Sequence, residues 1–309
     1  MEETQPWISY KDKEMYKLLY KPFKIYGKQF LKYFFLALIP EFILFGISQI
    51  VIIELSVRNY IHGPVIEFIM DFIGETRNQR ENMMTAFAFL LLLAFIAIMY
   101  RSSLLSNITW KTIEEGKANV FWVIDRTFRK TKEILLLTLF LITIAALPFV
   151  LILLAVILQG STFLYAYIFG WMTVMLAIAI PVIFYGRISM FIAGMSKDNL
   201  HVGAAIQASW RLSSQKNYIR TTTVFIVFAT LGLFLPWGLS LYITQIYTGI
   251  WIQFGMIFIR GLFYPLFDIA FTLTYMNAEY IAIEKAVFSE SIKEQRKLSK
   301  MRIENSSSK

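Results

Sequence analysis

The sequence predicts an all-α, polytopic membrane protein with six transmembrane helices, and three observations support this prediction. Six apolar runs each come close to the roughly 20 residues that a helix needs to cross a bilayer. These runs cover residues 33–55, 84–100, 134–158, 163–185, 224–246 and 261–278. Across the chain, 57% of the residues are hydrophobic and 17% are charged, and the mean hydropathy is +0.57. This composition excludes an ordinary soluble domain of 309 residues.

The third observation is the distribution of basic residues over the connectors. Twenty-six of the 30 Lys and Arg residues precede the first run, follow the sixth, or lie in the second and fourth connectors, and we count Arg101 with the second connector. The other four are Arg58, Arg77, Arg80 and Arg260. Basic residues in short loops are retained on the cytoplasmic side. We therefore expect a multi-pass protein of the plasma membrane with both termini in the cytoplasm.

The net charge of +9 then belongs to the cytoplasmic face. In a soluble chain such a charge would suggest nucleic acid, but beside membrane spans anionic lipid is the nearer partner. We therefore predict membrane lipids, mainly anionic, as partners, and no nucleic acid. We interpret 1–309 as a single integral membrane domain. It comprises a basic interfacial segment over 1–32, a six-span bundle over 33–285 and a basic cytoplasmic tail over 286–309.

The segment before the first run has the pattern of an amphipathic helix at the membrane surface. Its lysines recur every three or four residues, which places them within about 100° of arc on a helix. They are Lys13, Lys17, Lys21, Lys24, Lys28 and Lys32. Ammonium groups so placed contact lipid phosphates, at about 1 kcal/mol per residue near an anionic surface. The alternative is that the lysines only orient the first span. Pro22 is expected to divide the segment into two helices.

An internal repeat relates the two long basic connectors. Residues 120–129 align with 202–211 at an offset of 82, with identical Val, Ile and Arg positions, and each stretch precedes a run that contains a proline. The match predicts an internal duplication of span-elbow-span units, in which each elbow is an amphipathic interfacial helix. A cytoplasmic protein partner could bind these elbows. The candidate contact residues are Phe121, Ile124, Phe128, Ile206, Trp210 and Arg211.

Several of these stretches resemble one family. The basic aromatic segment over 16–30, the Leu38-Ile39-Pro40-Glu41 sequence and the Ala-Ile-Gln-Ala-Ser-Trp-Arg-Leu stretch at 205–212 resemble the membrane domain joined to some bacterial glycerophosphodiester phosphodiesterases. Related stand-alone six-span proteins share this pattern. The resemblance covers roughly residues 10–290 and implies a six-helix membrane bundle. In fused relatives the hydrolase activity belongs to a separate soluble barrel, for which this chain has no room. The resemblance therefore carries no catalytic residue over.

A search for catalytic motifs supports the same conclusion. His62 and His201 are the only histidines, and they lie on predicted opposite sides of the bilayer. The chain has no cysteine and no HExxH, GxSxG, Walker A or GxGxxG pattern. We therefore expect no metal, no cofactor and no enzymatic activity, and an intramembrane enzyme is the least favoured class.

Two carboxylates lie inside predicted spans. Glu41 lies about 12 Å from the cytoplasmic edge and Asp268 about 11 Å from the opposite edge, at 1.5 Å per helical residue. Each must be protonated, share a proton, contact water or meet a polar partner, because an unpaired ionised carboxylate is costly there. In one interpretation they line a polar cavity for protons, a cation or a basic headgroup. In the other, each carboxyl group bonds a carbonyl freed by Pro40 or Pro265, or a hydroxyl, and ties helices together.

Two functional hypotheses follow. The preferred one is a non-enzymatic, polytopic membrane protein that interacts with lipids, supported by the lysine stripe and the family resemblance. The alternative is a permease or transporter subunit that uses a polar cavity around Glu41 and Asp268. Since the chain has no P-loop, a separate ATPase would have to supply any ATP hydrolysis.

Overall fold

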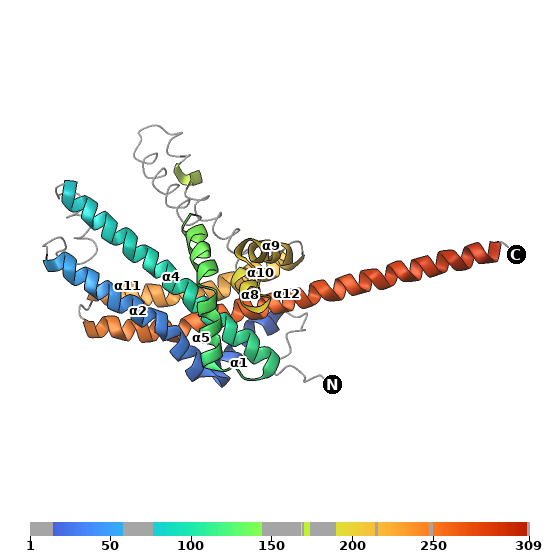
Figure 1. Ribbon diagram of the computed structural model, residues 1–309, viewed down its shortest axis with the longest axis horizontal. Helices are drawn as coiled ribbons and strands as arrows, with labels where there is room; N and C mark the ends of the chain where they lie inside the picture. Colours follow the sequence, from blue (N-terminus) through green and yellow to red (C-terminus); the bar gives the residue numbers. More distant parts are fainter. Residues whose placement is uncertain are drawn as a thin grey trace.

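A computed structural model describes residues 15–57, 77–143, 168, 170–173, 190–213, 216–246 and 250–307. Every regular element in these ranges is a helix, so the all-α prediction is confirmed for them (Figure 1). The elements are α1 (Met15–Lys28), α2 (Phe30–Val57), α4 (Arg77–Glu115), α5 (Val120–Arg129), α8 (Phe191–Lys197), α9 (Val202–Leu212), α10 (Lys216–Ala229), the π-helix η1 (Thr230–Phe234), α11 (Leu235–Ile246) and α12 (Ile250–Ser307). Residues 131–143, 168 and 170–173 are also helical.

Three helices of the described chain are long and apolar enough to cross a membrane. They are Phe30–Val51 in α2, Ala88–Glu115 in α4 and Trp251–Glu284 in α12. These helices contain the first, second and sixth predicted spans. The fifth predicted span is helical through α10, η1 and α11, whereas the third and fourth lie largely outside the described residues. The count of six spans stays a prediction.

Helices α2, α4 and α12 pack against one another as a three-helix unit. Helix α1 and the α10–η1–α11 segment also pack against α12. Two glycines allow close crossings with α12: a Cβ atom at Gly261 would lie 2.6 Å from Leu38 Cδ2, and one at Gly232 would lie 2.8 Å from Phe267 Cβ. In a membrane, the hydrophobic effect does not drive helices together, so helices associate through close packing. Small residues allow their backbones to approach closely.

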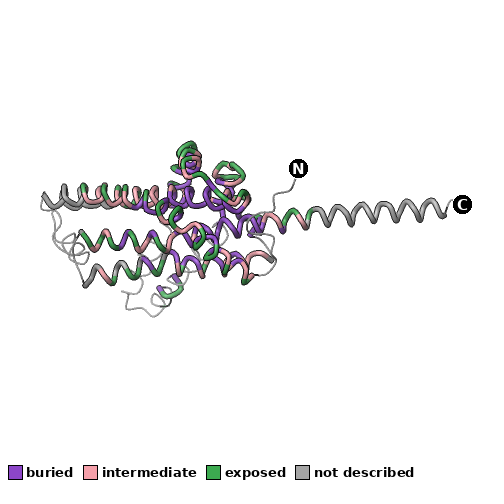
Figure 2. The backbone as a smooth tube through the Cα atoms, turned by 90° about the horizontal axis from the view of Figure 1, so that it is seen from below, coloured by how far each residue is buried: buried purple, intermediate pink, exposed green. Residues whose placement is uncertain are grey.

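Burial is concentrated at one end of the three-helix unit. Figure 2 shows the buried residues where α2, α4 and α12 lie beside α1 and the elbow helices. In 42–51 and 85–98, by contrast, no described side chain is buried. Those halves of α2 and α4 carry mostly apolar side chains, which suits contact with hydrocarbon. The space between them is where a cavity can form.

The two elbows are built alike. The two elbow helices are α5 and α9, and a residue in the left-handed conformation lies in the turn before each of them. Gly116, before α5, has φ 77°, and Asn199, before α9, has φ 58°. In α5 the buried positions include Val123 and Thr127, and in α9 the corresponding positions are Ala205 and Ser209, at the same offset of 82. The aligned elbow helices therefore bury the same face in the same register.

One local prediction is wrong. Pro22 does not divide the N-terminal segment, because α1 continues through it and the break falls at Gln29, between α1 and α2. Pro22 and its neighbour one turn earlier, Leu18, are both buried in the packed face of α1. Tertiary packing thus holds α1 helical despite the hydrogen bond that a proline removes.

Candidate functional site

Arg101 joins the two predicted intramembrane acids. Its side chain is 1% exposed, and Nη1 donates a hydrogen bond of 2.9 Å to Glu41 Oε1. Its Nε lies 3.9 Å from Asp268 Oδ2, and its guanidinium carbon lies 3.8 Å from the centroid of the Tyr264 ring. Glu41 and Asp268, on α2 and α12, therefore share one cation from α4. Of the alternatives open to these carboxylates, a polar partner inside the bundle is the one found.

The assignment of Arg101 to a connector is wrong. The apolar run ends near Tyr100, but α4 continues to Glu115. Its polar residues 101–103, 106 and 107 are buried against protein. The proline-freed carbonyl of Gly261, four residues before Pro265, accepts a hydrogen bond of 3.5 Å from the Tyr26 hydroxyl. Glu41 and Asp268 thus pair with Arg101, and the freed carbonyl of Gly261 is hydrogen-bonded by the Tyr26 hydroxyl instead of by a carboxyl group.

A polar face of α12 continues this cluster. Arg260, Tyr264, Asp268 and Thr272 follow one another at intervals of four residues, so they share a helix face. Thr272 Oγ1 donates a hydrogen bond of 2.9 Å to Ser106 Oγ on α4. Arg260 Nη1 lies 3.8 Å from the second carboxylate oxygen of Glu41, Oε2. With two guanidinium and two carboxylate groups, the cluster is electrically neutral when all four are ionised.

A cavity of about 300 Å³ lies between α2, α4 and α12 on the side away from α1. We call it the span cavity. Among the described residues, Glu41 and Arg260 are the ionisable ones that line it, and Gln49 and Gln253, joined by a hydrogen bond of 2.8 Å, also line it. The other lining residues are Leu44, Phe45, Ser48, Leu90, Ala94, Met256 and Ile257. The transport hypothesis places both predicted acids at a polar cavity; here Glu41 lines the span cavity and Asp268 does not.

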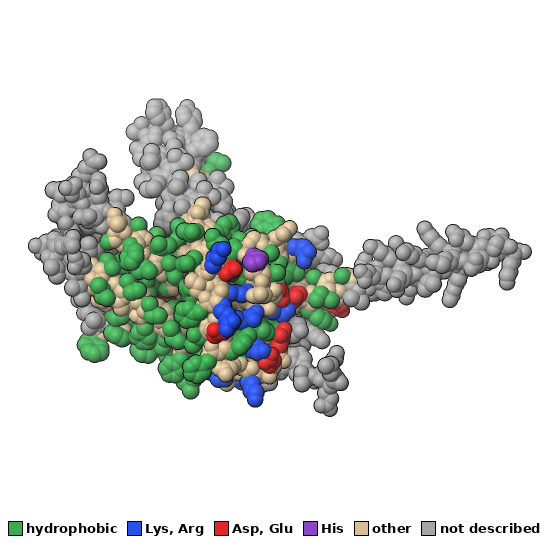
Figure 3. All heavy atoms as spheres, in the orientation of Figure 1, with side chains coloured by type: hydrophobic (Ala, Val, Ile, Leu, Met, Phe, Trp, Pro, Cys, Tyr) green, Lys and Arg blue, Asp and Glu red, His purple; other side chains and the backbone are tan. Residues whose placement is uncertain are grey.

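A second cavity, of about 340 Å³, lies at the first elbow and is rich in cations. We call it the basic pocket. It is lined by Arg126, Arg129, Lys130, Glu133, Asn199, Leu200 and His201. In Figure 3, charged side chains and a histidine gather over the elbow helices, beside a broad hydrophobic surface toward the free ends of α2 and α4.

The two inner cations of the basic pocket are held by backbone carbonyls. Arg126 Nη2 donates a hydrogen bond of 2.8 Å to Ser196 O, and Lys130 Nζ donates to Met195 O. Arg126 also lies over the rings of Trp110 and Trp122, at 5.4 and 5.2 Å from their centroids. These partners orient the cations without supplying a full negative charge.

The electrostatics of the basic pocket follow from this arrangement. Burial, and then the charge of Arg126, lowers the pKa of Lys130 from 10.5 to about 8, while Glu133 acts in the opposite direction. Burial also lowers the pKa of Arg126. Of the three lining cations, Arg129 is paired with Asp125 at 2.9 Å. Among the described residues, Arg126 and Lys130 together face one lining carboxylate, Glu133, so the described lining carries surplus positive charge.

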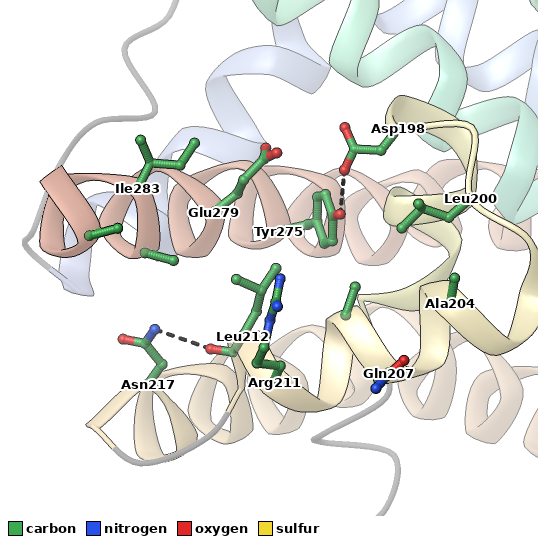
Figure 4. A pocket seen from close by; sticks show the side chains of 13 residues that line it. Asp198, Leu200, Ala204, Gln207, Arg211, Leu212, Asn217, Tyr275, Glu279 and Ile283 are labelled. Atoms are coloured by element: carbon green, nitrogen blue, oxygen red, sulfur yellow. Dashed lines mark hydrogen bonds between the residues drawn. The ribbon is translucent and has the colours of Figure 1, made fainter.

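A cavity of about 770 Å³ lies at the second elbow, between α9, the start of α10 and α12 (Figure 4). Its Tyr275 hydroxyl hydrogen-bonds the Asp198 carboxylate, and Glu279 forms an ion pair with Lys197. Arg211, a predicted elbow residue, also lines it. Within the described lining, Asp198 and Glu279 are the acidic residues and Arg211 is the cation, so this lining does not repeat the positive surplus of the first elbow.

The predicted lysine stripe lies largely on α1. Lys17, Lys21, Lys24 and Lys28 belong to this helix, and Lys13 lies outside the described residues. Lys32, on α2, donates a hydrogen bond of 3.4 Å to Ala118 O. The buried face of α1 comprises Leu18, Pro22, Ile25 and Tyr26, whereas Tyr16, Tyr20 and Phe23 are exposed. The helix thus has one face on the protein and exposed aromatic and basic side chains elsewhere.

The predicted elbow contact residues fall into two groups. Phe121, which is 82% exposed, Phe128 and Trp210 are accessible. Ile124 and Ile206 instead pack against the hydrophobic clusters of the molecule. The accessible aromatic side chains are therefore the exposed part of the predicted contact set.

Comparison with protein-family models, curated proteins and solved structures gives no match for this chain. Within the described residues, no three or more His, Asp and Glu side chains are grouped so that they could hold a metal ion. The arguments about function therefore rest on the residues themselves. Sequence reasoning overlooked the inward roles of Arg101, Arg126, Lys130 and Arg260, although the four-residue spacing from Arg260 to Thr272 was a readable signal.

Proposed function

We propose that this chain is a non-enzymatic, six-span protein of the plasma membrane whose cytoplasmic face binds the phosphate groups of anionic phospholipids. The basic pocket carries this proposal. Its inner cations, Arg126 and Lys130, are oriented by carbonyl groups and face one lining carboxylate, Glu133. An anionic headgroup supplies the charge that the pocket lacks.

The surroundings of the pocket support a lipid as the ligand. An apolar groove of about 340 Å³ runs between α2 and α4 to the first elbow, where Ile124, Thr127 and Phe128 line it. The lysine stripe and the exposed tyrosines of α1 provide a second surface suited to headgroups. The common register of α5 and α9 supports the duplication on which the six-span topology rests.

Native mass spectrometry of the purified full chain tests the proposal. The protein is incubated in detergent with either phosphatidylglycerol or phosphatidylcholine, and the retained lipid is counted. We expect phosphatidylglycerol to be preferred and the double variant Arg126→Gln/Lys130→Met to bind it at least tenfold more weakly, at about 1 kcal/mol per cation. Lys132→Gln is the matched control, because Lys132 is an exposed cation of the same segment that does not line the pocket.

A quadruple Gln variant of Lys17, Lys21, Lys24 and Lys28 distinguishes the basic pocket from the lysine stripe. If the basic pocket dominates, this variant retains most of the preference for phosphatidylglycerol. Equal binding of the two lipids by the wild-type chain, or an equal loss in Lys132→Gln and in the pocket variant, would refute the proposal.

A further inference from the structure

We propose that the span cavity binds a small zwitterion, meaning a molecule with a primary ammonium group and an anionic oxygen group a few bonds apart. This site is separate from the basic pocket, so the inference does not depend on the proposed binding of anionic lipid. It would also give the transport hypothesis a ligand class. Three features support it: the geometry of Glu41 and Arg260, the charge of the lining, and the size of the cavity.

Glu41 and Arg260 both line the cavity, and no short hydrogen bond joins their side chains. Glu41 uses Oε1 to accept the 2.9 Å hydrogen bond from Arg101, and it lines the cavity. Its other oxygen, Oε2, is 3.8 Å from Arg260 Nη1, which is longer than the roughly 2.7–2.9 Å of a charge-assisted hydrogen bond. A ligand ammonium can donate to Oε2 while an anionic oxygen of the same ligand accepts from the Arg260 guanidinium.

The charge of the lining favours a ligand that carries both signs. Glu41 and Arg260 contribute one negative and one positive charge, and most of the remaining lining is apolar. A lone cation or anion would bring a net charge into a site of low dielectric, where it is costly. A zwitterion adds no net charge, and each of its groups meets an opposite charge already in the wall.

Size and polarity agree with a small ligand. About 300 Å³ is at the lower end of ligand cavities. The hydrogen-bonded amides of Gln49 and Gln253 provide neutral polar contacts on the side away from Glu41. Two sources fit this chemistry: a free amino acid, or the headgroup of phosphatidylethanolamine, whose ammonium and phosphate groups have the same arrangement.

The test uses the purified full chain in phosphatidylcholine nanodiscs, since the trimethylammonium group of that lipid cannot donate N–H hydrogen bonds. One arm measures the binding of glycine and β-alanine, with methylammonium and acetate as single-charge probes. The other arm measures retention of phosphatidylethanolamine against phosphatidylcholine by native mass spectrometry. Binding in the first arm identifies a free solute, and preferential retention in the second identifies a lipid headgroup; either supports the proposal.

Arg260→Gln is the principal variant, because its side chain is 30% exposed and the Arg101–Glu41 bond stays intact. We expect it to weaken binding of the zwitterion at least tenfold, whereas Lys132→Gln, which removes an exposed cation that lines neither the span cavity nor the basic pocket, leaves binding unchanged. Because Glu41→Gln would also remove the partner of Arg101, Gln253→Leu serves as the second variant, with a smaller expected loss. The proposal is wrong if neither arm shows binding, if Arg260→Gln binds like the wild type, or if methylammonium or acetate binds as well as glycine.

Discussion

Two regions of the molecule turn arginine inward, and they balance its charge differently. In the three-helix unit, Arg101 meets the carboxylates of Glu41 and Asp268. At the first elbow, Arg126 and its neighbour Lys130 meet backbone carbonyls. The first region is neutral once Arg260, which lies 3.8 Å from Glu41, is included, whereas the second retains a positive surplus. The difference separates a cluster that holds helices together from a pocket suited to an external anion.

We expect the largest effect from a substitution that removes the buried cation of the first region. Arg101→Met leaves two carboxylates without their shared cation, and breaking a buried ion pair in this way costs about 3–5 kcal/mol. Folded yield and thermal unfolding in detergent measure the loss. The triple variant Arg101→Met/Glu41→Gln/Asp268→Asn removes all three charges and should recover most of it. A single variant as stable as the wild type would contradict the view that the acids need this cation.

A smaller effect concerns what holds the first elbow. Asn107 Nδ2 donates a hydrogen bond of 3.0 Å to Thr127 Oγ1, and both side chains are buried. Thr127→Val removes the acceptor and leaves the Asn107 amide unsatisfied, at a cost of about 1–3 kcal/mol in unfolding free energy. Thr223→Val is the control, because the Thr223 hydroxyl bonds a carbonyl of its own helix, Ile219 O. Equal effects in the two variants would show that Thr127 does not anchor the elbow.

The basic pocket should make the stability of the protein depend on pH through Lys130. The pKa of Lys130 falls from 10.5 to about 8 in the folded protein, so between these values the unfolded chain binds more protons. The contribution of Lys130 to stability therefore rises with pH over this window. Thermal unfolding of lipid-free wild type and Lys130→Met between pH 7 and 10 isolates this contribution as a difference. Bound anionic lipid should raise the pKa of Lys130 and move the rise to higher pH; an unchanged difference with lipid would argue against contact.

We expect the smallest change in stability from a substitution at Arg129, which should weaken lipid binding while leaving folding almost unaffected. The Arg129 side chain is 78% exposed and its ion pair with Asp125 is a surface pair on one helix. Such pairs contribute about 0.3–0.5 kcal/mol, so Arg129→Gln should unfold almost like the wild type. It should nevertheless bind phosphatidylglycerol several-fold more weakly, because Arg129 lines the basic pocket. Unfolding curves and lipid titrations of the same preparation check both statements.

The sequence was informative where side chains differ sharply from their surroundings. Glu41 and Asp268 are conspicuous in apolar runs, and their need for a polar partner was predicted. The identity of that partner was not, because the end of an apolar run near Tyr100 marks a change of composition and not the end of a helix. Helix α4 continues past Arg101 with polar residues that are buried by α2 and α12, a contact that depends on tertiary packing.

The repeat illustrates the same limit at the elbows. Alignment at the offset of 82 predicts the shared register of α5 and α9, but it does not predict their chemistry. Ala208 and Leu212 occupy the positions that correspond to Arg126 and Lys130. The cations of the first elbow reach the carbonyls of α8 across the fold, and no spacing within either connector reveals that contact. The register was therefore readable from local pattern, and the basic pocket was not.

Pro265 makes α12 easier to bend at one position. It lies between Arg260 and Asp268 and removes the helical hydrogen bond to Gly261 O, and helices bend most readily at such positions. Beyond the bend, toward Gln253, the helix carries one wall of the span cavity; on the other side, Asp268 is fastened to α4 through Arg101. Arg260, which faces Glu41 across this cavity, lies on the first part, so a tilt at Pro265 would change both the width of the span cavity and the distance between Arg260 and Glu41.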